Sequence, residues 1–110
     1  MPQETDDGRY RLSLKLPQEL LDRVESLAEE RRWSRSQTVR VLLSEGISGP
    51  DHGTEIPDEP GLLDSPISLV TDDGDMVRNV EGLADEEYDG SFNAAARWAI
   101  RNGLVEMNDL

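Results

Sequence analysis

The sequence predicts a mostly α-helical fold with short β-strands. Three observations predict it: a strictly alternating stretch at residues 10–17, two segments with helical spacing behind it, and a weaker copy of the same order in the second half. A chain of 110 residues has room for one small domain or two very small ones. Because a core of that size is marginal, we expect the chain to gain stability by oligomerisation.

The alternating stretch reads YRLSLKLP at residues 10–17. Successive residues of a β-strand lie on opposite faces, so this strand has one apolar face and one polar face. The apolar face comprises Tyr10, Leu12, Leu14 and Leu16. The polar face comprises Arg11, Ser13 and Lys15. The chain has a formal net charge of −13, so two cations on one short strand suggest a binding surface; the alternative is an ordinary solvated strand face.

Two helices are expected after the strand. Pro17 suits a helix start, and apolar residues at 20, 21, 24, 27 and 28 then lie on one face of a helix. Ser34 and Gln37 have the spacing of a capping box, which predicts the start of the second helix. Gly46 followed by Ile47 fits a glycine cap at its end.

Residues 66–104 repeat this order in weaker form, with Ile67 to Leu69 aligned under Leu12 to Leu14 and Ser91 under Ser34. We interpret them as a degenerate second copy; the alternative is an unrelated helix pair with generic amphipathic spacing. The predicted organisation is a flexible N-terminus at 1–8, a strand-helix-helix domain at 9–48, a Pro/Gly linker at 49–62 and an acidic C-terminal domain at 63–110.

The net negative charge of the chain lies almost entirely in its second half. Residues 1–50 hold 9 acids and 8 bases, whereas residues 51–110 hold 15 acids and 3 bases. Abundant Asp and Glu with a single Lys are typical of halophilic proteins, so the acidity does not exclude DNA as a partner. With no Cys and one His, we expect no metal site and no cofactor. Without an apolar run of membrane-spanning length or a signal peptide, we expect a cytoplasmic protein with no membrane partner.

Residues 9–47 resemble the ribbon-helix-helix family of Arc/MetJ-type DNA-binding transcriptional regulators. The resemblance rests on the strand RLSLKLP, the helix QELLDRVESLAEE and the second helix SRSQTVRVLL, in that order and spacing. It implies that two chains pair their strands in an intermolecular antiparallel ribbon, with the four helices packed beneath it. The implied dimer core comprises Leu12, Leu14, Leu16, Leu20, Val24, Leu27, Val39, Leu42 and Leu43.

The same resemblance implies how double-stranded DNA would be bound. The outer face of the ribbon enters the major groove, where Arg11, Ser13 and Lys15 read base edges. The start of the second helix contacts phosphate with its free backbone N–H groups and positive dipole end. The expected phosphate contacts are Ser34, Arg35, Ser36 and Gln37, with Arg9 and Arg32 as secondary ones.

The second half lacks this cationic face. If it repeats the first, Ser68, Val70 and Asp72 take the outward positions of its strand. We hypothesise that it mediates oligomerisation or a protein partner's contact through Phe92, Trp98, Ile100 and Leu104. The two copies can pair within one chain, or each can pair with its counterpart in a second chain. We favour the second arrangement, because a symmetric cationic ribbon needs two copies of YRLSLKLP.

We therefore predict a sequence-specific DNA-binding transcriptional regulator, acting without catalysis as a homodimer or homotetramer on a palindromic or tandem operator. One alternative is an antitoxin whose acidic C-terminal half binds a basic toxin, although such tails are often disordered until bound. Another is a structural or adaptor module that has lost DNA binding. An enzyme is the least favoured class, because the sequence holds no pairing of nucleophile and base and no glycine-rich phosphate loop.

Overall fold

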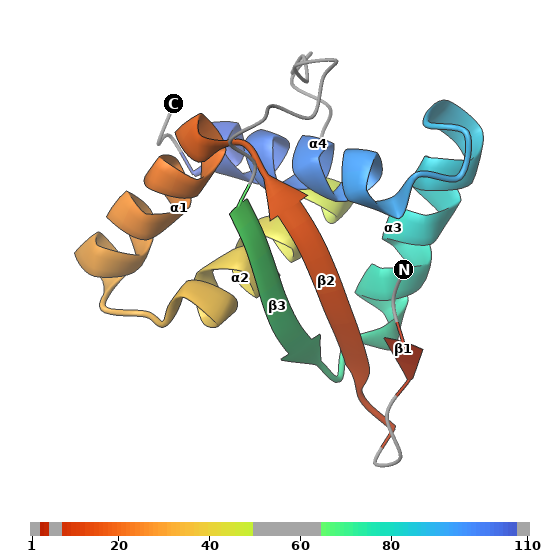
Figure 1. Ribbon diagram of the computed structural model, residues 1–110, viewed down its shortest axis with the longest axis horizontal. Helices are drawn as coiled ribbons and strands as arrows, with labels where there is room; N and C mark the ends of the chain where they lie inside the picture. Colours follow the sequence, from red (N-terminus) through yellow and green to blue (C-terminus); the bar gives the residue numbers. More distant parts are fainter. Residues whose placement is uncertain (1–2, 5–7, 50–64, 108–110) are drawn as a thin grey trace.

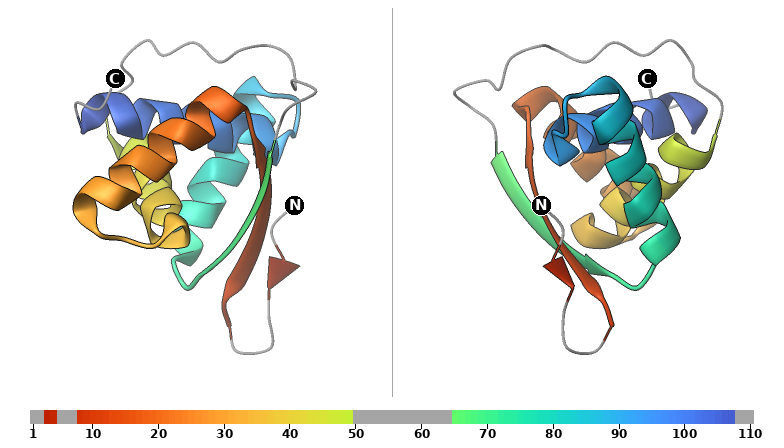
Figure 2. Two further views of the ribbon diagram at one scale, coloured as in Figure 1. Left: turned by 60° about the vertical axis from the view of Figure 1, so that its left-hand side comes forward. Right: turned by 90° about the vertical axis from the view of Figure 1, so that its right-hand side faces the viewer.

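The computed structural model describes residues 3–4, 8–49 and 65–107 of the chain. Its elements, in order, are β1 (Gln3–Glu4), β2 (Tyr10–Leu16), α1 (Gln18–Arg31), α2 (Arg35–Ser48), β3 (Ser65–Thr71), α3 (Gly74–Glu87) and α4 (Phe92–Glu106). Three strands form one sheet in the order β1-β2-β3, and the helices lie on one side of it (Figures 1 and 2). The second half thus repeats the strand-helix-helix order of the first. The predicted linker falls almost entirely outside the described residues.

The ribbon is formed within one chain. β2 pairs antiparallel with β3 over seven residues, with Ser13 opposite Ser68 at the centre (Figure 1). This corrects the preferred arrangement, in which β2 pairs with its counterpart in a second chain. The β3 strand satisfies the same need: Ile67 and Leu69 face the core opposite Leu14 and Leu12, and both are buried.

One hydrophobic core joins the two halves. All nine residues expected in the dimer core are buried, but the second copy in the same chain completes that core. The buried residues of the second half include Val77, Val80, Ile100 and Leu104. The argument for an obligatory second chain no longer holds, because a single chain supplies both strands and all four helices.

The apolar residues proposed as a partner surface in the second half are used for this core instead. Phe92 is 5% exposed, and Ile100 and Leu104 are not exposed at all. Trp98 is partly buried and packs against the same cluster. These four side chains therefore offer no free apolar face, which removes the structural basis of that hypothesis.

The two second helices, α2 and α4, make the most extensive helix contact and cross at glycines. A Cβ at Gly46 would overlap the carbonyl oxygen of Ala99, and a Cβ at Gly103 would overlap the carbonyl oxygen of Leu42. Asn102, fully buried, donates from Nδ2 to the carbonyl oxygen of Gly46 at 3.0 Å. Gly46 was predicted to cap α2, but the helix continues to Ser48 and the glycine serves this close approach.

The crossing predicts a large effect of adding one methyl group. Gly46→Ala or Gly103→Ala should lower the free energy of unfolding by about 2–4 kcal/mol, because backbone rather than a flexible side chain occupies the space. Gly82→Ala is the matched control, because Gly82 lies in α3 with nothing within 4 Å of its would-be Cβ. That control should raise stability by roughly 0.5–1 kcal/mol. Urea unfolding measures all three, and equal effects at the three positions would contradict the close crossing.

The ribbon register predicts the behaviour of engineered cysteines in a chain that has none. Ser13→Cys/Ser68→Cys should form a disulfide within one chain, because directly opposed residues lie at distances of about 4.5–5.5 Å that a disulfide spans. Non-reducing electrophoresis should show a monomer. Ser13→Cys alone should stay uncrosslinked, whereas a ribbon of two β2 strands would place this residue opposite its own counterpart. A covalent dimer of either variant would contradict the in-chain ribbon.

Candidate nucleic-acid interface

The outer face of the ribbon points away from the helices (Figure 2). Arg11, Ser13 and Lys15 are all exposed on it, as the alternation predicts. The register places Val70 opposite Arg11, where it is 36% exposed. Lys15 lies opposite Pro66. The cations of this face therefore come from β2 alone.

The outward positions of β3 differ in one respect from those expected. Ser68 and Val70 are exposed on the strand as predicted. Asp72, however, lies beyond the end of β3 at Thr71, and the β3 position paired with Lys15 belongs to Pro66. The aspartate expected to repel phosphate is thus beside the end of the ribbon, next to the N-cap of α3 at Asp73.

A hollow of about 470 Å³ lies between the start of α2 and the β3 side of the ribbon. Its lining comprises Arg11, Ser36, Arg40, Ser68, Leu69 and Val70. The Arg40 guanidinium donates from Nη1 to the carbonyl oxygen of Val70 at 3.4 Å, which directs this side chain toward the ribbon. The hollow brings together two guanidinium groups and the first turn of a helix, a combination suited to an anion such as phosphate.

Arg40 was not among the predicted site residues. The signal that would have found it is its position four residues after Ser36, because residues separated by four lie on the same helix face. A charged residue on that face of α2 therefore lies beside the same surface as Ser36. What the sequence does not show is that β3 would run alongside this face.

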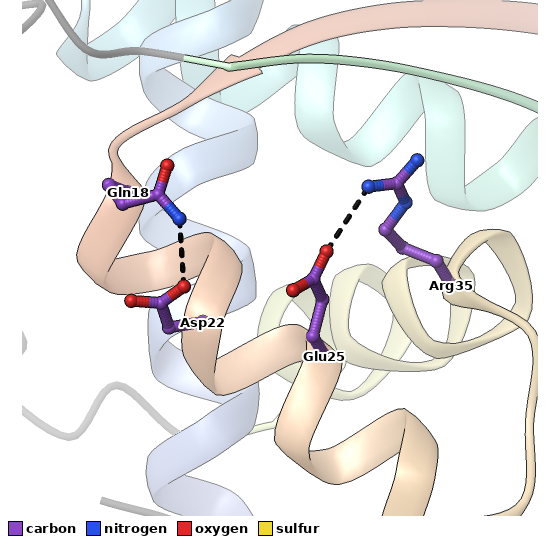
Figure 3. A network of polar contacts seen from close by, with 4 residues as sticks. All are labelled: Gln18, Asp22, Glu25 and Arg35. Carbon is purple, nitrogen blue, oxygen red and sulfur yellow. Dashed lines mark hydrogen bonds and ion pairs between the residues drawn. The ribbon is translucent and has the colours of Figure 1, made fainter.

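The start of α2 carries the predicted cap. The Ser34 hydroxyl accepts from the Gln37 backbone N–H at 3.1 Å. Ser34, Arg35 and Gln37 are exposed, and Ser36 is half-buried where it lines the hollow. Arg35 extends back to α1, where its Nη1 lies 3.2 Å from Glu25 Oε1 (Figure 3). That ion pair offsets the charge that Arg35 would offer to phosphate.

The remaining predicted cations lie apart from the hollow. Arg9 is exposed just before β2, and Arg32 is exposed in the turn between α1 and α2. Arg32 has a left-handed backbone with φ 58°, and its N–H ends α1 by donating to carbonyl oxygens of the last turn. Neither residue lines the hollow beside α2.

The start of α4, the counterpart of the α2 start, is occupied differently. Ser91 caps the helix by accepting from the Ala94 N–H at 3.2 Å. Asn93 Oδ1 accepts from the Lys15 backbone N–H at 2.7 Å, and Asn93 Nδ2 donates to the Lys15 carbonyl oxygen at 3.1 Å. These two bonds fix the backbone that carries Lys15. Asn93 therefore attaches α4 to β2, as Arg40 attaches α2 to β3.

Two further features bear on the class of site. Among residues 3–4, 8–49 and 65–107, no three His, Cys, Asp or Glu side chains group as metal ligands would. In the same part of the chain, no helix has the length and apolar character needed to span a membrane.

A two-stranded ribbon with a cationic outer face, supported by paired helices, defines a ribbon-helix-helix unit. Residues 10–47 match the family model described as ribbon-helix-helix protein, copG family. The N-terminal half is therefore a ribbon-helix-helix unit, which confirms the resemblance drawn from the strand and its two helices. The match covers about a third of the chain and does not extend to the second copy. No curated protein and no solved structure matches the chain significantly.

Proposed function

We propose that this chain is a sequence-specific DNA-binding transcriptional regulator that inserts the β2–β3 ribbon into the major groove. The observation that carries the proposal is the exposure of Arg11, Ser13 and Lys15 on the uncovered face of a two-stranded ribbon. A two-stranded ribbon fits the major groove, where Arg and Lys donate to guanine O6 and N7 and Ser serves several bases. The family match supports a binding role rather than catalysis.

Phosphate contacts would set the position of the ribbon on the duplex. The hollow beside α2 supplies Arg40 and Ser36 for one backbone phosphate, close to the free N–H groups at the start of the helix, while Arg11 at its rim faces the bases. Ser34 and Gln37 remain proposed neighbours of the same phosphate. Arg35 contributes less than its position in the sequence predicts, because Glu25 already pairs with it.

The in-chain ribbon changes the expected assembly. Ribbon-helix-helix proteins assemble their ribbon from two chains, whereas this chain contains both strands and all four helices. We propose that the DNA-binding unit is one chain, and that a homodimer or homotetramer would form by association of complete units on adjacent sites. The Asp- and Glu-rich composition fits a salt-rich cytoplasm in which carboxylates keep such units soluble.

The antitoxin alternative depends on an acidic segment that is available to a toxin. In the described part of the second half, β3, α3 and α4 are folded onto the shared core, which differs from the disordered acidic tail of such antitoxins, although the acids of α3 are exposed. The regulator is therefore the better-supported function. Co-purification with a small basic protein would favour the antitoxin instead.

The proposal predicts the effect of removing the ribbon cations. Arg11→Ala/Lys15→Ala should weaken binding to the preferred site by about a hundredfold or more, because each good base contact contributes about 1–3 kcal/mol. Fluorescence anisotropy with DNA upstream of the protein's own gene measures the loss. The control is Arg23→Ala/Arg101→Ala, which removes the same charge from α1 and α4. Equal losses in the two double variants would contradict base readout by the ribbon.

The small number of cations near the ribbon predicts a shallow salt dependence. Each neutralised phosphate contributes about −0.9 to the slope of log K against log salt. Phosphate contacts by Arg40, Arg9 and Arg32 give about −3, and counting Arg11 and Lys15 as well gives an upper bound of about −5, by the same relation. Titrations at several KCl concentrations measure the slope. A slope steeper than about −7 would require more cations than this surface supplies.

A further inference from the structure

The ribbon has an approximate two-fold axis through its central pair. Ser13 lies opposite Ser68, and the pairs on each side follow in register. A ribbon of two identical strands would present the same side chains twice about such an axis. On the core face that equivalence is kept at two positions, because Ile67 and Leu69 correspond to Leu12 and Leu14, whereas the buried Thr71 corresponds to Leu16.

On the outer face the equivalence is lost. About the central pair, the position of Arg11 on β2 corresponds to Pro66 on β3, and the position of Lys15 corresponds to Val70. One strand therefore carries two cations where the other carries none. Of the large apolar side chains in the described ranges, Val70 stands out as exposed, at 36%, and it lies opposite Arg11.

The starts of α2 and α4 are also unequal, and again the richer supply of cationic donors is on one side only. The start of α2 adjoins a hollow that Arg11, Arg40 and Ser36 line. At the start of α4, Phe92 is buried and Asn93 is bonded to the Lys15 backbone. An anion therefore finds two guanidinium groups beside α2, whereas beside α4 it finds one cation, Lys15, and an amide that already has partners.

The charges of the turns strengthen this difference. Residues 29–37, which lead into α2, contain three Arg and two Glu. Residues 85–93, which lead into α4, contain four acids and no Lys or Arg. A duplex lying across the ribbon brings its phosphates toward both helix starts, and Coulomb interaction favours the first and opposes the second.

We propose that one chain reads a non-palindromic DNA site, an inference that rests on the DNA-binding function proposed above. Arg11 and Lys15 of β2 contact guanines. Val70 of β3 contacts the C5-methyl group of a thymine beside the guanine of Arg11, since apolar side chains recognise that group in the major groove. The phosphate backbone is held at the start of α2 and not at the start of α4.

The first test selects binding sites from random duplexes with the full chain. The wild-type protein should yield one consensus without two-fold symmetry. Pro66→Arg/Val70→Lys gives β3 the two cations of β2 at equivalent register positions, so this variant should select a site with a two-fold symmetric core. A palindromic wild-type consensus, or an unchanged consensus for the variant, would overturn the proposal.

The second test does not depend on a double substitution that alters β3. The guanine read by Arg11 is first located as the position whose preference is lost in Arg11→Ala. Replacement of the neighbouring thymine by deoxyuridine removes one methyl group and should weaken wild-type binding about fourfold, the factor for one buried CH₂-sized group. Val70→Ala should show no such difference. Thymines outside the selected site serve as controls.

The outcomes of the two tests distinguish failure of asymmetric readout from failure of DNA binding itself. If the wild-type chain selects a site but deoxyuridine affects wild type and Val70→Ala equally, asymmetric readout by Val70 is wrong while DNA binding stands. If the chain selects no duplex at all, the DNA-binding function fails and the inference fails with it.

Discussion

The close crossing of α2 and α4 is the contact on which the rest of the structure depends. Gly46 lies against the backbone of Ala99, and Gly103 lies against the backbone of Leu42, so the two halves of the chain contact each other through bare backbone. Glycine within a helix costs about 0.5–1 kcal/mol relative to alanine. Each of the two helices has one such glycine, and the packing gained by the close approach offsets the cost of both. The crossing also brings the start of each helix to the strand of the other half.

Local signals account for most of the first half. Alternation predicted β2, Pro17 preceded α1, and the Ser34 cap placed the start of α2. Signals of this kind act within a few residues, so they can be read from one stretch of sequence. Gly46 shows where such reasoning fails. A glycine after an apolar run satisfies the pattern of a helix cap, and only the neighbouring helix reveals that it permits a close contact instead.

The partner of β2 and the position of Arg40 could not be derived from the first half alone. Leu12 and Leu14 require an apolar strand beside them, but β2 of a second chain and β3 of the same chain meet that requirement equally. Connection within one chain decides the choice, because it raises the effective concentration of β3 without a second molecule. Arg40 gains its role only once β3 lies beside α2. The outer-face residues of β2, by contrast, followed from alternation because exposure depends only on the face.

Covalent connection of the copies has an evolutionary consequence. In a ribbon of two identical chains, every substitution appears twice and both strands must satisfy the core and the groove together. Here Ile67 and Leu69 form the apolar face of β3, while its positions equivalent to Arg11 and Lys15 carry no charge. Selection on packing and selection on recognition thus act on separate residues. The second copy is free to change its outer surface as long as its inner face still fits.

The contacts of Asn93 and Arg40 with the ribbon also bear on how the protein avoids aggregation. A two-stranded ribbon has two outer edges of backbone N–H and C=O groups, which can template pairing with another chain. On the β2 edge, β1 pairs beside Tyr10 and Arg11 and Asn93 bonds both backbone groups of Lys15, and on the β3 edge Arg40 donates to the Val70 carbonyl oxygen. In concentrated salt, where the repulsion between acidic chains is screened within a few ångströms, charge no longer keeps such edges apart. Side chains that cover the edges directly retain their effect there, so the face of the ribbon can stay exposed while its edges do not seed a larger sheet.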